Sequence, residues 1–168
     1  MVQTTTLTTR VFAGAMLLIS IAVLGGALAS QYWGALDPCE LCLLERWPWC
    51  AAIAISAALW FASNRLSLTA AAVLLALVFL VSAGLGFYHA GIELHWFAGP
   101  SACTASGTAA TNIDELRAQL TGKQPVMCDQ VQWSLFGVSL AGWNALVSLA
   151  LGGFCAMTAR GCHLRSAA

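Results

Sequence analysis

Four long apolar segments constrain this chain more than any other feature. They cover about residues 11–32, 43–62, 66–88 and 135–158. At ~1.5 Å of rise per residue, about 20 helical residues cross the ~30 Å hydrocarbon core of a bilayer. Only 8% of the residues are charged, whereas soluble domains carry about 25%. A surface exposed to water cannot be built with such a small number of charges. Lipid is therefore the expected solvent.

The apolar segments predict an all-α fold, with residues 1–168 forming a single membrane domain built as a four-helix bundle. The first segment is longer than the ~7–15-residue apolar region of a secretory signal peptide, and no clear A-x-A cleavage site follows it. We therefore expect it to be a retained helix. Small residues within the spans, such as Gly86 and Gly142, would let the helices approach closely. No run of basic residues indicates nucleic-acid binding.

The connections between the spans predict the topology. The loops at about 33–42 and 91–134 share one side, and the termini share the other side with the tight turn at 63–65. All seven acidic residues lie on the loop side, and four of the seven basic residues lie on the terminal side. The positive-inside rule then places both termini in the cytoplasm. A belt of tryptophans is expected near the outer interface: Trp33, Trp47, Trp49, Trp96 and Trp133.

The seven cysteines sort by side of the membrane. Cys39 and Cys42 form a C-x-x-C motif in the first outer loop, and Cys103 and Cys128 lie in the second. The outer compartment, which permits disulfides, therefore holds two pairs. The other three lie in spans or in the C-terminal tail, and we expect them to be free thiols: Cys50, Cys155 and Cys162.

A C-x-x-C motif serves either redox chemistry or metal binding. Here it follows Pro38, and a helix is expected to begin at or just after it. A helix N-terminus lowers the pKa of a thiol. Arg46 lies one helical turn beyond Cys42, where it could stabilise negative charge on Cys42 or on a bound electron acceptor, or pair with Glu45. Pro48 should kink the helix or mark its effective start.

The second outer loop contains a short segment of amphipathic character. Thr111–Leu120 has a capping residue, acidic residues in its first turn and an apolar stripe. We expect a short helix on the membrane surface that tethers the loop. A disulfide in this loop would be easily presented to another protein, although a static structural bridge is the alternative.

Several of these motifs together resemble the bacterial disulfide bond formation protein B (DsbB) family. Residues 37–46 are similar to its P-C-x-L-C-x-x-x-R signature, and the cysteine pairs occur in the family's order. The segment Tyr88–Gly91 resembles a family segment, as does Cys128-Asp129 with the residues that follow it: Trp133, Gly137 and Trp143. The resemblance covers nearly the whole chain.

The resemblance implies a thiol oxidase of the bacterial inner membrane, with quinone (ubiquinone or menaquinone) as electron acceptor. It would reoxidise a periplasmic thioredoxin-like dithiol carrier (DsbA-like), which attacks a Cys103–Cys128 disulfide at Cys103. Cys128 would then attack a Cys39–Cys42 disulfide, with Cys39 as the exposed target. Cys42 would be released beside the quinone. Arg46 and His89 are the other residues that the resemblance places near the quinone.

Three other functions are compatible with parts of the pattern. The outer cysteines could bind a metal, although structural zinc sites usually show two close pairs. The protein could instead be a structural tetraspan with static disulfides. A vitamin K epoxide reductase-like enzyme is disfavoured. In that family the C-x-x-C motif comes late in the chain, after the loop cysteines, whereas here it comes first. We expect a redox site without a metal.

Overall fold

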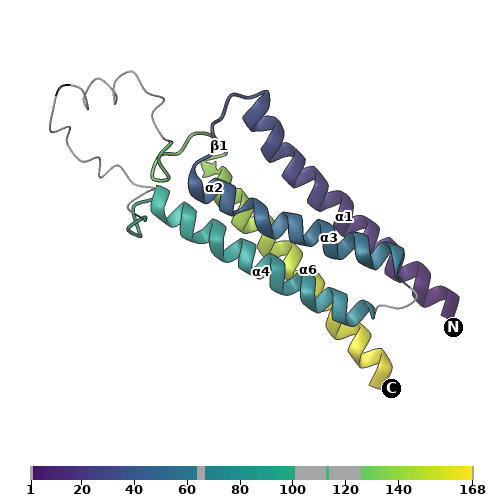
Figure 1. The fold of residues 1–168 in the computed structure, drawn as a ribbon. Coiled ribbons are helices and arrows are strands. Elements are labelled where there is room, and N and C mark those ends of the chain that lie inside the picture. The colour runs from purple at the N-terminus through teal and green to yellow at the C-terminus, as the bar shows by residue number, and fades with distance from the viewer. Residues whose placement is uncertain (1, 64–66, 101–112, 114–125, 168) are drawn as a thin grey trace.

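The computed structural model describes residues 2–63, 67–100, 113 and 126–167. Its four long helices run side by side as a bundle, with both termini at one end (Figure 1). They are α1 (Val2–Tyr32), α3 (Arg46–Phe61), α4 (Leu68–Glu93) and α6 (Leu140–Ala167), and the short helix α2 (Glu40–Leu44) precedes α3. With α2 and α3 taken together as one span, all four are long and apolar enough to cross a membrane. The predicted all-α membrane bundle is confirmed.

The bundle is apolar both inside and outside. Helix α4 packs along α6 and α3, and α3 packs along α1. Phe79, Leu59 and Leu75 are fully buried between the helices. Large apolar side chains also cover the outward faces, as in Leu18, Val81, Leu77, Leu80 and Leu149. Exposing such a surface to water costs about 25 cal/mol per Å², so this surface is suited to lipid.

Gly86 lets α4 and α6 come into backbone contact. A Cβ atom at this position would lie 2.8 Å from the Ala145 nitrogen and 2.9 Å from the Ala141 oxygen. Real Cβ atoms essentially never approach other heavy atoms this closely. The expected role of small residues in close helix packing is therefore met at Gly86.

The second span is interrupted at Glu45, which ends α2 and precedes α3. Pro48 lies in the first turn of α3 and has no N–H to donate to the Leu44 carbonyl, so one helical hydrogen bond is missing here. Pro48 thus marks the start of α3, one of the two outcomes predicted for it. The interruption leaves the Glu45 side chain buried inside the bundle.

The fourth span begins later than the predicted residue 135, because a β-hairpin precedes it. Strands β1 (Ser134–Leu135) and β2 (Val138–Ser139) pair antiparallel. Phe136 and Gly137 between them have φ values of 54° and 77°, as in the type I′ turns that close two-residue hairpins. A right-handed helix cannot pass through two such residues, so α6 starts at Leu140.

Two other helices extend beyond the residues expected to cross the membrane. Helix α1 begins before residue 11, and α4 continues beyond residue 88 to Glu93. The amphipathic helix expected at Thr111–Leu120 lies outside the described residues except for Ile113, and Cys103 lies outside them as well.

Candidate functional site

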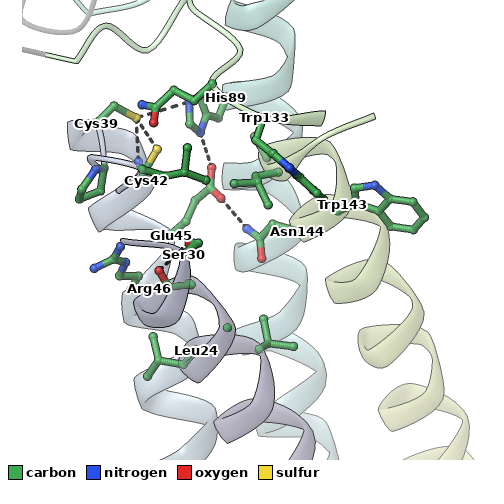
Figure 2. A pocket seen from close by; sticks show the side chains of 18 of the residues that line it. Leu24, Ser30, Cys39, Cys42, Glu45, Arg46, His89, Trp133, Trp143 and Asn144 are labelled. Carbon is green, nitrogen blue, oxygen red and sulfur yellow. Dashed lines mark hydrogen bonds and ion pairs between the residues drawn. The ribbon is translucent and has the colours of Figure 1, made fainter. Parts of the chain in front are cut away.

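A cavity of about 360 Å³ lies between the helices, and its wall includes Cys39 and Cys42 of the C-x-x-C motif. Helix α2, which begins within this motif, lies at the end of the bundle opposite the termini (Figure 1). Helices α1 and α6 both line the cavity. Nearer the termini these helices touch through Phe12 with Phe154 and through Met16 with Cys155. The wall is mostly apolar, and its ionisable and amide side chains near the C-x-x-C motif include Cys39, Cys42, Glu45, Arg46, His89 and Asn144 (Figure 2). The lining also includes Asp37, Glu93, Gln130 and Gln132.

The two cysteines of the motif are positioned by the start of α2. Cys39 is the N-cap residue, and its Sγ accepts a hydrogen bond of 3.1 Å from the Cys42 backbone N–H. The two Sγ atoms are 2.6 Å apart, and both residues are free thiols. A disulfide bond is about 2.05 Å long, so a small side-chain movement suffices to form it. The expectation that a helix begins at or just after the motif is met.

The helix start favours the thiolate of Cys39. The hydrogen bond with the Cys42 side chain lowers the pKa of the Cys39 thiol below its ordinary value, and the Cys42 backbone N–H lowers it further. Burial of Cys39 opposes both effects but does not cancel them. Cys39 therefore takes the N-terminal position that stabilises a thiolate, whereas Cys42 lies within the first turn and supplies the donors.

A buried hydrogen-bond network supports the motif from α3, α4 and α6 (Figure 2). His89 Nδ1 lies 2.7 Å from Glu45 Oε1, and Asn144 Nδ2 donates to Glu45 Oε2 over 2.8 Å. Trp49 Nε1 donates to Asn144 Oδ1 over 2.9 Å. The other ring nitrogen of His89, Nε2, lies 3.6 Å from Cys39 Sγ. The network thus fixes the His89 ring against the sulfur of Cys39.

Arg46 lines the cavity but points toward α1. Its Nη1 donates to Gln31 Oε1 over 2.8 Å. The possible ion pair with Glu45 is not formed, because Glu45 bonds to His89 and Asn144 instead. Within the described part of the chain, no hydrogen bond joins Arg46 to Cys42.

Cys128 lies close to the C-x-x-C motif. It is disulfide-bonded, 1% exposed, and belongs to one cluster of buried side chains with Cys39, Leu41 and Ile92. The expectation that Cys39 is an exposed target is wrong, since Cys39 is only 3% exposed. Cys39 nevertheless belongs to the same buried cluster as Cys128, which is the residue expected to attack it.

Sequence reasoning missed several polar groups of the cavity. Trp49 was expected in the interfacial belt, but it is 3% exposed and bonds to Asn144. Glu93 carries a buried Oε2 atom that makes no hydrogen bond to any described residue. Among these residues, the sequence alone could have indicated a role for Asn144, because an amide side chain inside an apolar span usually forms a hydrogen bond to a neighbouring helix.

The remaining described cysteines stand apart from this network. Cys50 is exposed and Cys162 is partly exposed. Cys155 is buried, with its Sγ 3.8 Å from the Met16 sulfur. All three are free thiols, as predicted.

One comparison with known proteins identifies a family. A family model described as "Disulfide bond formation protein DsbB" matches residues 9–158, from α1 into α6. No curated protein and no solved structure gave a match. The matched segment contains Cys39, Cys42, Cys103 and Cys128 and all the polar residues of the cavity. Because the match covers most of the chain and four helices can cross a membrane, this multi-pass membrane protein belongs to the DsbB family of disulfide bond formation proteins.

Proposed function

We propose that the protein is a thiol oxidase that reoxidises a periplasmic thioredoxin-like dithiol carrier and passes the electrons to quinone. The observation that carries this proposal is the position of the Cys39–Cys42 pair, which forms part of the wall of a mostly apolar cavity between membrane helices. A static disulfide in an outer loop has no need of such a cavity, whereas delivery of electrons to a lipid-soluble acceptor requires one.

Electrons enter at the second cysteine pair. A thiolate of the reduced carrier attacks Cys103 of a Cys103–Cys128 disulfide, which breaks that bond and frees Cys128. The second carrier thiol then resolves the mixed disulfide, so the carrier leaves oxidised. Cys128 attacks the sulfur of Cys39 in a Cys39–Cys42 disulfide and releases Cys42. The cluster that holds Cys39 with Cys128 supports this transfer.

The second half of the cycle restores both disulfides. Cys103 attacks the Cys39–Cys128 bond and re-forms its own disulfide with Cys128, which leaves Cys39 and Cys42 reduced with the two electrons of the carrier. Their oxidation re-forms the Cys39–Cys42 bond and releases two electrons and two protons. The 2.6 Å separation of the two sulfurs favours this closure.

The residues of the cavity fit a quinone. Its volume of about 360 Å³ is in the range of small-molecule sites, and its mostly apolar wall suits the ring and the start of an isoprenoid tail. Arg46 and His89, which both line the cavity, would hold the quinone, and the Glu93 oxygen that has no hydrogen-bond partner among the described residues offers a further polar group. A bound quinone, either ubiquinone or menaquinone, would supply the capacity to accept two electrons and two protons.

The proposal includes a location and an orientation. We infer a bacterial inner membrane, with the cysteine end of the bundle in the periplasm and both termini in the cytoplasm. Both termini lie at the end of the bundle away from the motif (Figure 1). Four of the seven Lys and Arg residues lie on the side of the termini in the sequence, which supports this orientation.

The test is the quinone-dependent oxidation of a reduced carrier by membranes that contain the protein. Cys42→Ser should abolish this activity, because no Cys39–Cys42 disulfide can form. The matched control is Cys50→Ser, since Cys50 is an exposed free thiol that does not line the cavity. Retained oxidation in Cys42→Ser, or equal loss in both variants, would contradict the proposed role of the pair.

A further inference from the structure

We propose that the reduced Cys39–Cys42 pair and His89 form a binding site for a soft divalent cation such as Zn²⁺, and that this cation holds the protein in its reduced state. The first part stands on geometry alone. The second part, arrest of the catalytic cycle, rests on the proposed function.

The ligand atoms already lie near the positions that zinc requires. The two Sγ atoms and a ring nitrogen of His89 lie within 4.8 Å of one another. Tetrahedral zinc, with bonds of ~2.3 Å to sulfur and ~2.0 Å to nitrogen, separates sulfur from nitrogen by about 3.6 Å. The observed distance from Cys39 Sγ to His89 Nε2 is 3.6 Å. Only the Cys42 sulfur must move, because two zinc-bound sulfurs lie about 3.8 Å apart.

His89 is oriented as a metal ligand. Metal-binding histidines almost always donate their second ring N–H to a carboxylate, a carbonyl or water, which fixes the tautomer and the ring orientation. Here Nδ1 lies 2.7 Å from Glu45 Oε1, and Asn144 holds the other carboxylate oxygen. With the proton on Nδ1, the lone pair on Nε2 is directed toward Cys39. The network therefore supplies the outer shell of a carboxylate–histidine–metal arrangement.

Charge and access also favour a cation at this position. Two thiolates neutralise a divalent ion, which lowers the cost of burying it among apolar side chains. All three ligand residues line the cavity, so the fourth coordination position would face open space. Three protein ligands with an open fourth position are a known zinc geometry.

Binding would depend on the redox state. A Cys39–Cys42 disulfide offers no thiolate, so only the reduced pair can bind the ion. Binding converts two thiols to two metal-bound thiolates and releases two protons, with no change in oxidation state. While the ion is bound, the two sulfurs cannot form a bond with each other. The cation would thus compete directly with re-formation of the disulfide.

Cobalt binding to the full-length protein in detergent tests the site. The protein is reduced with a phosphine, which is then removed, and Co²⁺ is added as a spectroscopic probe. We expect one equivalent of Co²⁺ with tetrahedral absorption and a thiolate charge-transfer band, displaced by Zn²⁺. Protein oxidised with diamide should show neither band. Absence of both bands from the reduced protein would overturn the proposal.

Variants assign the ligands. His89→Ala and Glu45→Gln should each weaken Co²⁺ binding by about 10-fold or more, as loss of a ligand or of an outer-shell partner does. Two variants with several cysteines replaced should still bind one equivalent of Co²⁺: Cys103→Ser/Cys128→Ser and Cys50→Ser/Cys155→Ser/Cys162→Ser. Circular dichroism checks that each variant remains helical.

Two outcomes with these variants would also overturn the site. One is loss of Co²⁺ binding in Cys103→Ser/Cys128→Ser, which would indicate a site shared between the two cysteine pairs. The other is unchanged binding in Cys39→Ser/Cys42→Ser. The assay uses neither quinone nor carrier, so its failure is distinguishable from failure of the proposed oxidase activity.

Discussion

The Glu45 carboxylate connects three helices through its two oxygens. It lies between α2 and α3, bonds to His89 of α4 through Oε1 and accepts from Asn144 of α6 through Oε2. A buried carboxylate is costly unless its partners satisfy it. Glu45 therefore has two consequences: it ties the helices together around the cavity, and it fixes the ring of the histidine beside Cys39.

Asn144→Ala should destabilise the protein by about 1–3 kcal/mol, because it leaves Glu45 Oε2 and the indole N–H of Trp49 without this partner. The measurement is thermal unfolding in detergent, followed by circular dichroism. Leu146→Ala on the same helix is the control, since Leu146 is 52% exposed on the apolar outer surface. A melting temperature for Asn144→Ala no lower than that of Leu146→Ala would show that the network contributes little to stability.

The Cys39 thiol should ionise at lower pH than an ordinary cysteine, for which the pKa is about 8.5. Hydrogen bonds from Cys42 stabilise the Cys39 thiolate, so the thiolate forms earlier as pH rises. In the reduced protein, the rate of iodoacetamide modification at Cys39, measured by peptide mass spectrometry, should reach half its maximum below that pH. Cys42→Ala removes the largest contribution and should move the midpoint upward. An unchanged midpoint would rule out this explanation.

At the scale of the elements, the contact between α4 and α6 determines how closely these two helices can approach each other beside the cavity. Gly86 permits backbone contact with Ala141 and Ala145. Ser82 and Ser148 add a buried hydrogen bond of 2.9 Å between the same two helices. This interface holds His89 and Asn144 at a fixed spacing, because the two residues extend from α4 and α6 toward Glu45.

Gly86→Ala should therefore destabilise the bundle by about 1–3 kcal/mol, the usual cost of overpacking. The added methyl group would meet backbone atoms of α6, which cannot move aside as a side chain can. Gly84→Ala is the matched control on the same helix, because a Cβ there meets nothing within 4 Å. Alanine also favours helix over glycine by about 1 kcal/mol, so Gly84→Ala should be neutral or stabilising. Equal melting temperatures for the two variants would contradict the close approach.

At the scale of the whole molecule, sequence alone predicted the four spans but not the network between them. Long apolar runs determine a membrane helix almost by themselves. The hairpin before α6 escaped prediction because Leu135 and Phe136 read as the start of an apolar span. The contacts of Glu45 with His89 and Asn144 join residues far apart in the chain, so only the packed bundle reveals them. The C-x-x-C motif was found because its residues are adjacent in sequence.

The relation between the two cysteine pairs is also a property of the whole molecule, because it joins a loop to the start of a helix. Cys128 and Cys39 share one buried cluster. If electrons flow from the loop pair to the C-x-x-C pair, trapping Cys103 should drive Cys128 onto Cys39. A reduced carrier with a single reactive cysteine can form the mixed disulfide with Cys103 but cannot resolve it.

Under these conditions, in the absence of quinone, peptide mapping should find a disulfide between Cys39 and Cys128, with Cys42 free to react with a thiol label. The physical reason is proximity, since thiol–disulfide exchange requires direct access of the thiolate to the target sulfur. Cys39→Ser is the control and should yield no such linked peptide. A predominant link between Cys42 and Cys128 would reverse the assigned roles of the two cysteines. No link of either kind would mean that the two pairs do not exchange electrons directly.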